Sequence, residues 1–483
     1  MKNLSSHIAG PLTDFFNQTI KEGELPKDWK IAIISPIFKK GSRKLASNFR
    51  PISLTAILSK MMESFIRDNI LCHLLENDLL SKRQHGFISG RSTVTMLLSF
   101  LDKCVASVSS GNVVDAIYLD FEKAFDKVPH YRLIKKLQAY GIEGNILKWI
   151  KEFLLRRSQR VAVNGTRSFI GQVISGVPQG TVLGPLLFVI YINDMLDALT
   201  TDGFLFADDG KIFKEILSKE DTDDLQFDID RLEEWANTWL LRFNVDKCHV
   251  LTLGKLDNIA YTRRYNLGGA ELEHVFVEKD LGVLVDSNLS FEDHISSKVN
   301  KANQLVGLIR RTFTFLDLKT FSKLYTSLVR PHLEYAQCIW SPHLKKYQRQ
   351  IENVQFRATK LVDKLQNVNY PERLKRLNLP TLAFRRFRGD LIELYKHFHC
   401  YDRDIISDSF QPKHRSNRRH GYQIYERRAN DGIRGVQQNS FYYRTPRAWN
   451  ELPSTVVEAE DINTFKRRLD EHLKEHPLKF EFN

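Results

Sequence analysis

The feature that most restricts the fold of this chain is the position of three aspartates at the ends of apolar strands. Residues Val113–Leu119 form a largely apolar run that predicts a buried strand, and Asp120 follows this run directly. Farther along, residues 204–213 (FLFADDGKIF) predict two short strands around a tight turn that contains Asp208 and Asp209. A carboxylate beside buried apolar residues is costly unless it is paired or bound to a cation. We therefore expect the three aspartates to form a site that holds a cation.

Carboxylate oxygens are ligands that suit Mg²⁺, with Mn²⁺ as an alternative. Two such ions roughly 3.5–4 Å apart would lower the pKa of an attacking 3′-hydroxyl and stabilise a leaving pyrophosphate. Taken alone, however, a single aspartate is more often a turn former or a helix cap, and an adjacent pair in a turn is also weak evidence. The inference therefore depends on the residues that surround the three aspartates.

Three motifs in a fixed order contain these aspartates: YLDFEKAFD (118–126), SGVPQGTVLGP (175–185) and FADD (206–209). Further segments precede and follow them: PIFKKG (36–41), NFRPIS (48–53), QHGF (84–87), GRST (90–93), FNVDKC (243–248), LGV (281–283), FEDH (291–294) and WNELP (449–453). Together they resemble the reverse transcriptases of non-LTR (LINE-type) retrotransposons, in the jockey-like and chicken-repeat-like group. The resemblance covers roughly residues 15–475.

This resemblance implies roles for the residues of the first and third motifs. Asp120 and Asp208 would be the principal ligands of two Mg²⁺ ions, with Asp209 in support, and the peptide carbonyl of Phe121 would add a further oxygen. Phe125 would close the space beneath the sugar of the incoming nucleotide and so favour dNTPs over NTPs. RNA-templated RNA polymerases usually have an aspartate at this offset, so Phe125 points to DNA synthesis.

Other matched residues would bind the nucleic acid and the nucleotide. Gln179 and Gly180 would support the template strand and the nascent base pair. Arg50 would contact the triphosphate of the incoming nucleotide, because a guanidinium can bind phosphate oxygens bidentately. Lys39 and Lys40 are either further phosphate contacts or lysines of a surface turn.

The remaining candidates have competing structural interpretations. Lys247 would either protonate the leaving pyrophosphate or form a salt bridge. Residues 91–93 would position template RNA and also cap a helix. Four further polar side chains are expected to be structural or solvated, the histidines because no second His or Cys lies at ligand spacing: Glu122, Asp126, His85 and His294.

The resemblance implies an α+β fold shaped like a right hand. Fingers and a palm with an antiparallel sheet would occupy residues 1–285, a helical thumb residues 286–370, and a basic, mostly helical C-terminal region residues 371–483. Periodicity and turn residues predict a strand at 31–38, a hairpin of 160–163 and 169–173 around Asn164-Gly165, and helices at 58–75, 129–140, 181–199, 222–241, 295–313, 318–334, 347–365 and 462–473.

Basic residues are concentrated in one part of the chain. The formal net charge is +13, and 19 of the 71 Lys and Arg but only 5 of the 58 Asp and Glu lie between Ser297 and Arg388. A basic segment of this kind suits contact with a phosphate backbone, although a solvated basic helix surface is the alternative. Because the segment coincides with the expected thumb, the predicted partners are template RNA, primer or target DNA, and dNTPs.

The sequence also restricts the cellular compartment in which the protein can reside. The five cysteines do not have metal-ligand spacing, no secretory signal is visible, and the longest apolar stretch, at 183–192, is about half of a membrane span. We therefore expect an intracellular protein, nuclear or cytoplasmic or both. The basic clusters at 385–388 and 413–419 are either import signals or, as we favour, surface loops.

Some features of the family differ or are not seen. Gly210 replaces the threonine that often follows the two aspartates, and we expect no endonuclease domain before the polymerase. Two rival hypotheses stay open: a nonenzymatic nucleic-acid-binding remnant of a retroelement, and an RNA-templated RNA polymerase. The intact carboxylates, Arg50 and Gln179-Gly180 argue against the first, and Phe125 argues against the second.

Overall fold

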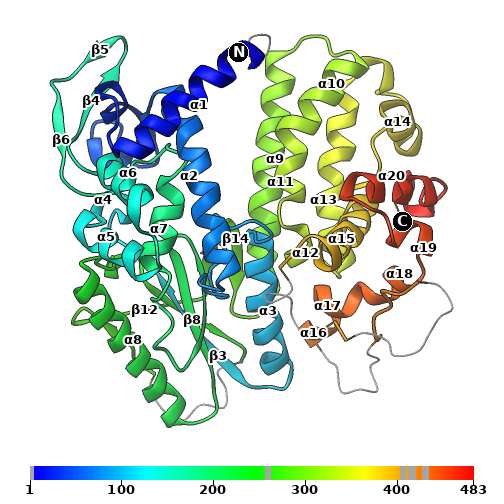
Figure 1. Cartoon of the computed structure of the whole chain (residues 1–483). Helices are drawn as coiled ribbons and strands as arrows, with labels where there is room; N and C mark the ends of the chain where they lie inside the picture. The colour runs from blue at the N-terminus through cyan, green and yellow to red at the C-terminus, as the bar shows by residue number, and fades with distance from the viewer. Residues whose placement is uncertain (1–4, 256–262, 403–409, 412–419, 427–434, 483) are drawn as a thin grey trace.

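The computed structural model describes residues 5–255, 263–402, 410–411, 420–426 and 435–482 (Figure 1). Strands and helices are mixed in the first part of the chain, and from α9 (Glu292–Thr312) onward the regular elements of the described residues are helical. Figure 1 shows these two parts side by side, with the later helices on the right. The mixture of strands and helices matches the predicted α+β class.

A five-stranded sheet of order β12-β9-β3-β8-β7 forms the centre of the first part. Neighbouring strands run antiparallel except β9 and β12, which pair in parallel at one edge. The predicted antiparallel sheet is therefore confirmed for all but this edge strand. The bounds of the strands are β3 Val113–Leu119, β7 Asp202–Phe206, β8 Asp209–Ile216, β9 His249–Leu253 and β12 Glu273–Val275.

Strand β3 is the middle strand of this sheet and is buried along its whole length. Ala116 and Tyr118 pack into the core that contains α3 (Thr93–Ser109), whereas Ile117 and Leu119 pack into the core on the opposite face. Successive side chains of a strand point to opposite faces of a sheet. A strand covered on both faces is therefore apolar at nearly every position, which is why this segment was predictable from sequence.

A second sheet, of order β2-β1-β4-β5 with β6 beside β4, lies near the N-terminal helix α1 (Ser5–Glu22). The predicted turn at Asn164-Gly165 is confirmed, because both residues have positive φ, 49° and 82°. The returning strand is shorter than predicted and is divided into β5 and β6. The bounds are β1 Ile31–Phe38, β2 Phe49–Leu54, β4 Arg157–Val163, β5 Thr166–Arg167 and β6 Gly171–Val173.

Helices cover these sheets. The predicted helix at 181–199 is wrong in length, because α7 covers only Gly184–Ile192. Thr181 lies in the turn before the helix, where its hydroxyl oxygen accepts from the backbone N–H of Gly184 (3.2 Å). The other predicted helices of this part are confirmed within a few residues: α2 Ile57–Glu76, α5 His130–Ala139 and α8 Lys219–Trp239; α6 Gly144–Leu154 was not predicted.

The helices after the sheets begin with α9, which follows a small hairpin of β13 (Val277–Asp280) and β14 (Val283–Asp286). The predicted helix at 318–334 is present but is not uniform. A π-helical turn at Tyr325–Val329 joins α10 (Leu318–Leu324) to α11 (Arg330–Glu334), which has Pro331 near its start. Proline cannot donate a backbone hydrogen bond, and this explains the irregular turn before it.

The C-terminal helices are α12 Gln337–Trp340, α13 Lys345–Ala358, α14 Tyr370–Leu377, α15 Leu382–His399, α16 Gly435–Asn439, α17 Phe441–Arg444, α18 Pro446–Asn450, α19 Ser454–Val457 and α20 Ile462–His472. The predicted helix at 347–365 thus ends near Ala358 and continues as short 3₁₀ turns. The predicted helix at 462–473 is confirmed.

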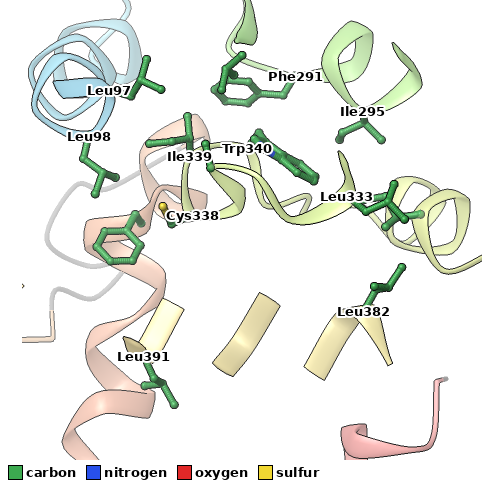
Figure 2. Packing of buried hydrophobic residues seen from close by; sticks show 14 of the residues in the cluster. Leu97, Leu98, Phe291, Ile295, Leu333, Cys338, Ile339, Trp340, Leu382 and Leu391 are labelled. Atoms are coloured by element: carbon green, nitrogen blue, oxygen red, sulfur yellow. The ribbon is translucent and has the colours of Figure 1, made fainter. Parts of the chain in front are cut away.

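One hydrophobic core joins the helices on both sides of residue 370 (Figure 2). Leu333 and Trp340 belong to it together with Leu382 and Leu391, and Leu98 of α3 reaches the same core. The division of the chain at residues 285 and 370 stays a prediction, but the packing joins the C-terminal region to the thumb-like helices and to α3.

The described residues include five cysteines, all with free thiols. No helix in the described part of the chain combines the length and the apolar character that crossing a membrane requires.

Candidate active site

The three aspartates lie at the same end of the central sheet, where strands β3 and β7 finish and strand β8 begins. In the antiparallel ladder Leu119 of β3 is opposite Gly210 of β8, so the next position of the ladder sets Asp120 opposite Asp209. Phe206 of β7 pairs with the same Asp209, and Asp208 is in the connecting turn. The β7–β8 hairpin and the end of β3 therefore bring together the carboxylates that the sequence predicted.

Burial and mutual repulsion make the carboxylates of Asp208 and Asp209 unfavourable as anions. Burial raises the pKa of Asp208, and the negative charge of Asp120 raises it further. Burial, then the charges of Asp208 and Asp120, raise the pKa of Asp209 to about 6, although this side chain keeps contact with solvent. Oxygen ligands with uncompensated negative charge are the donor set that a hard divalent cation prefers. The residues present thus fit Mg²⁺.

Asp120 is also paired with Lys247. The Lys247 Nζ donates to Oδ1 of Asp120 at 2.9 Å, and both side chains are partly exposed. As the side chains stand, no group of three His, Cys, Asp or Glu residues among those described is arranged around a metal position. The fold therefore brings the three carboxylates to one end of the sheet. In the observed side-chain orientation, however, the carboxylate of Asp120 is paired with Lys247.

Phe121 is held by a short antiparallel bridge to Phe243. The bridge uses the carbonyl of Asp120, which accepts from Asn244 N–H (2.7 Å), and the N–H of Glu122 (2.9 Å). The carbonyl of Phe121 is outside this pair of bonds, as a ligand oxygen would need to be. The Phe121 and Phe243 rings stack with centroids 4.6 Å apart, which fixes the backbone next to Asp120.

Phe125 is half-buried and lies between two other aromatic rings. It stacks on Phe188 of α7 with a centroid distance of 4.3 Å and meets Phe87 edge to face at 6.4 Å. Its backbone carbonyl accepts from Val177 N–H (2.7 Å), which joins the first motif to the second. These contacts hold the Phe125 ring in one position, five residues after Asp120, as a steric filter requires.

Gln179 and Gly180 connect the second motif to the neighbouring elements. The Gln179 Nε2 donates to Asp126 Oδ1 at 3.0 Å, and the Gln179 carbonyl accepts from Ser53 N–H of β2 at 2.7 Å. Gly180 has φ +101°, and a Cβ there would lie 2.9 Å from the Ser53 carbonyl oxygen. Glycine is therefore required at this position by close packing against β2, and Asp126 has the structural role expected of it.

Arg50 and Lys39 lie on the β1–β2 hairpin. Arg50 pairs with Ile37 in the ladder, and Lys39 N–H donates to the Asn48 carbonyl just beyond it (2.9 Å). Both side chains are exposed, and their positive charges lower the pKa of Asp208. The β1–β2 hairpin thus places the positively charged side chains of Arg50 and Lys39 on the side of the molecule that faces the three aspartates.

Residues 91–93 are placed differently from the prediction. The Arg91 guanidinium is buried and donates to the carbonyls of Ser81 and Gln84 (2.6 and 2.7 Å) and to Asp402 (2.9 Å). It is therefore not available to template RNA, and that interpretation is wrong for Arg91. The predicted helix cap is confirmed, because Ser92 forms a capping box at the start of α3.

The two histidines are buried in the protein. Burial, followed by the charge of Arg91, lowers the pKa of His85 to about 3, and burial lowers that of His294 to about 3. His85 Nδ1 lies 2.9 Å from the Thr95 hydroxyl, and His294 Nδ1 accepts from Leu284 N–H at 3.0 Å. Both are neutral side chains that satisfy local groups.

Gln84 is a residue of the site that the sequence did not assign. It lies in the QHGF segment (84–87) and hydrogen-bonds to the turn before Asp208. A glutamine two residues before a glycine in a matched motif was the available signal. Its partner is far away in sequence, so the contact was not predictable.

The comparisons with known proteins identify the family of this chain. A family model described as reverse transcriptase (RNA-dependent DNA polymerase) matches residues 37–305. The chain therefore belongs to the reverse transcriptase family, and its right-hand α+β fold class is the one predicted. The predicted resemblance to non-LTR (LINE-type) reverse transcriptases is also confirmed.

Three relatives of the chain come from mobile elements of Drosophila. The chain is 31% identical to the RNA-directed DNA polymerase from mobile element jockey of Drosophila funebris, over 66% of this chain and 36% of that protein. It is 28% identical to the jockey protein of Drosophila melanogaster (74% and 43%) and 28% identical to the probable RNA-directed DNA polymerase from transposon BS of the same species (72% and 40%). The chain thus spans less than half the length of these relatives.

Among solved structures, the chain is similar to apo telomerase from Candida tropicalis, with a TM-score of 0.43 and 11% identity over 77% of this chain and 65% of that one. It is also similar to telomerase from Candida albicans in complex with a fragment of telomeric RNA, with a TM-score of 0.38 and 13% identity over 78% and 68%. These scores add nothing to the assignment, which depends on the family match.

Proposed function

We propose that this chain is an RNA-directed DNA polymerase that extends a primer 3′ end with dNTPs on an RNA template. The observation that carries the proposal is the meeting of Asp120, Asp208 and Asp209 at one end of the sheet that faces Arg50 and Lys39. Carboxylates that bind cations and cations that bind a triphosphate are the two halves of a nucleotidyl-transfer site. The family match supports the same activity.

Metal ions would complete the carboxylate half. Asp120, Asp208 and Asp209, with the carbonyl of Phe121, would hold two Mg²⁺ ions, or Mn²⁺ in their place. When bound, the ions would lower the pKa of the primer 3′-hydroxyl and stabilise the leaving pyrophosphate.

The protein's own residues would orient the nucleotide. Arg50 and Lys39 bind the phosphate oxygens, and Phe125, held between Phe188 and Phe87, excludes a 2′-hydroxyl. Lys247 Nζ is the proposed proton donor to the pyrophosphate, since it already lies at the Asp120 carboxylate.

Gln179 and Gly180 would support the template and the nascent base pair from the loop that packs on β2. The duplex would bind against the exposed basic side chains of α9 and α10: Lys301, Arg310, Arg311, Lys319 and Lys323. Other basic residues of the 297–388 segment are engaged within the fold, such as Arg385 with Glu334 and Arg388 with Asp470.

The partners would be template RNA, primer or target DNA, and dNTPs, in the nucleus, the cytoplasm or both. The cluster at 385–388 is in helix α15 with Arg386 buried, so the interpretation as a surface loop is wrong there. The cluster at 413–419 lies outside the described residues.

The second candidate function is nucleic-acid binding without catalysis. It is favoured only by the Asp120–Lys247 ion pair, because that pair occupies one carboxylate oxygen. The raised pKa values of Asp208 and Asp209 argue against it, since retaining repelling carboxylates has a cost and no benefit without a cation.

Primer extension on poly(rA)–oligo(dT) with Mg²⁺ and dTTP tests the proposal. The wild type should extend the primer, Asp208→Asn should bind the duplex with unchanged affinity but not extend it, and Asp223→Asn, at an exposed position of α8, should behave as the wild type. Duplex binding by the wild type without extension would favour the binding-only function.

A further inference from the structure

The turn that carries Asp208 and Asp209 is held by one buried amide. The Gln84 Oε1 accepts from the backbone N–H of Ala207 at 3.0 Å and from that of Gly86 at 2.7 Å. Gln84 is fully buried, with 0% of its surface exposed. A buried N–H that loses its acceptor is strongly unfavourable, so this oxygen fixes where the backbone before Asp208 can lie.

The held residue has a conformation that its own chemistry disfavours. Ala207 has φ +51°, in the left-handed region that residues with a Cβ rarely adopt. The peptide that begins the turn therefore needs an external contact to keep it in place, and Gln84 provides that contact. A relaxed Ala207 would turn the following Asp208 away from Asp120.

Two further contacts bring the Gln84 segment against β7. Leu205 N–H donates to the Arg83 carbonyl (2.8 Å), and His85 N–H donates to the Leu205 carbonyl (2.7 Å), which forms a parallel bridge. Gly86 closes the approach, because a Cβ there would lie 2.3 Å from Ala207 N. The side-chain oxygen thus acts from a segment that is itself fixed on the strand.

Arg91 further stabilises the segment that contains Gln84. Its guanidinium donates to the carbonyl of Gln84 and forms an ion pair with Asp402, which follows α15. The support of the catalytic turn therefore extends from Ala207 through Gln84 and Arg91 to the C-terminal region.

We propose that Gln84 is a positioning residue for nucleotidyl transfer: its Oε1 holds the Ala207 peptide so that Asp208 and Asp209 face Asp120. The proposal depends on the proposed function of these carboxylates. Because Gln84 Nε2 has no hydrogen-bond partner among the described residues, only the oxygen carries this role.

Three variants separate the oxygen from the rest of the side chain. Gln84→Leu keeps the size and removes the acceptor, whereas Gln84→Glu keeps an acceptor at the same reach. Gln138→Leu, on the exposed surface of α5, is the matched control. The readouts are amide hydrogen exchange at Ala207, kcat and KM for dTTP in primer extension, and Kd for the primer–template duplex.

Gln84→Leu should lose exchange protection at Ala207 and lower kcat about 100-fold, as misplacement by about 1 Å does, with KM and Kd within about threefold of wild type. Gln84→Glu should keep the protection and at least about a tenth of kcat. Gln138→Leu should match the wild type. If Gln84→Leu does not fold, Gln84→Asn replaces it with the same expectation, since its amide is one methylene shorter.

Wild-type protection and kcat in Gln84→Leu would overturn the proposal, as would equal losses in the leucine and glutamate variants. Failure of the wild type to extend a primer would instead refute the proposed function. In that case the exchange at Ala207 would still decide whether Gln84 holds the turn, because it is measured without substrate.

Discussion

A buried ion pair next to the active site gives the sharpest stability prediction. Lys211 of β8 and Asp280 of β13 form this pair, with only 1% and 4% of their side chains exposed. The Lys211 ammonium also lies over the Phe100 ring, 4.2 Å from its centroid, and Tyr118 OH donates to Asp280 at 3.1 Å. Lys211 is two residues after Asp209, so the pair fixes the strand that follows the catalytic turn.

Lys211→Met should destabilise the fold by about 3–5 kcal/mol, because it leaves the Asp280 carboxylate buried and uncompensated. Asp280→Asn in the wild type should also cost about 3–5 kcal/mol, because it leaves the Lys211 ammonium buried without a counter-charge. In the Lys211→Met background, Asp280→Asn should instead stabilise, since it removes the isolated charge and keeps an acceptor for Tyr118. Asp280→Asn thus has opposite expected signs in the two backgrounds.

Urea unfolding followed by tryptophan fluorescence measures these free energies. Lys346→Met is the matched control, because Lys346 and Glu292 form an exposed pair at 3.4 Å and the loss should be less than about 1 kcal/mol. Destabilisation by Asp280→Asn of similar size in both backgrounds would refute the reasoning, since it would mean that the two charges do not interact.

Three further predictions concern the carboxylates and the steric filter. Phe125→Ala should admit ribonucleotides and lower the discrimination between dTTP and rUTP about 10–100-fold, measured as the ratio of kcat/KM values; unchanged discrimination would exclude Phe125 as the filter. Because the pKa of Asp209 is raised to about 6, kcat at low Mg²⁺ should fall as pH decreases through about 6. Added Mg²⁺ should shift this decrease in kcat to lower pH. A decrease whose pH does not depend on the Mg²⁺ concentration would contradict metal binding by Asp209. The raised folded-state pKa of Asp208 also means that stability is lost as pH rises above the ordinary pKa of an aspartate, so Asp208→Asn should raise the Tm of the Mg²⁺-free protein at pH 8. Mg²⁺ should raise the Tm of the wild type more than that of the variant, and equal Mg²⁺ effects on both would count against Asp208 as a ligand.

The elements around the aspartates were predictable because local sequence fixes them. Strand β3 is apolar on both faces, and Asn164-Gly165 has the two positive φ values that its residue types favour. The strand and turn patterns predicted that Asp120, Asp208 and Asp209 lie at strand ends, and the resemblance carried by the three motifs implied their role as metal ligands.

Contacts between distant segments were not predictable. The resemblance implied that Arg91 helps to position template RNA, but its partners Gln84 and Asp402 are brought to it only by the fold. Arg386 looked like part of a basic surface, yet α15 turns it into the protein. The role of Gln84 has the same origin, since Ala207 approaches it only when β7 pairs with residues 83–85.

The central claim is that the three aspartates catalyse template-directed addition of deoxynucleotides. Single-nucleotide incorporation on a primed RNA of defined sequence tests it, with each dNTP offered separately to the wild type, Asp120→Asn and Asp208→Asn. We predict that the wild type adds only the dNTP complementary to the template base, and that both variants bind the duplex with unchanged Kd but add nucleotides at least about 1,000-fold more slowly. Wild-type rates in either variant, or binding without addition by the wild type, would contradict the claim.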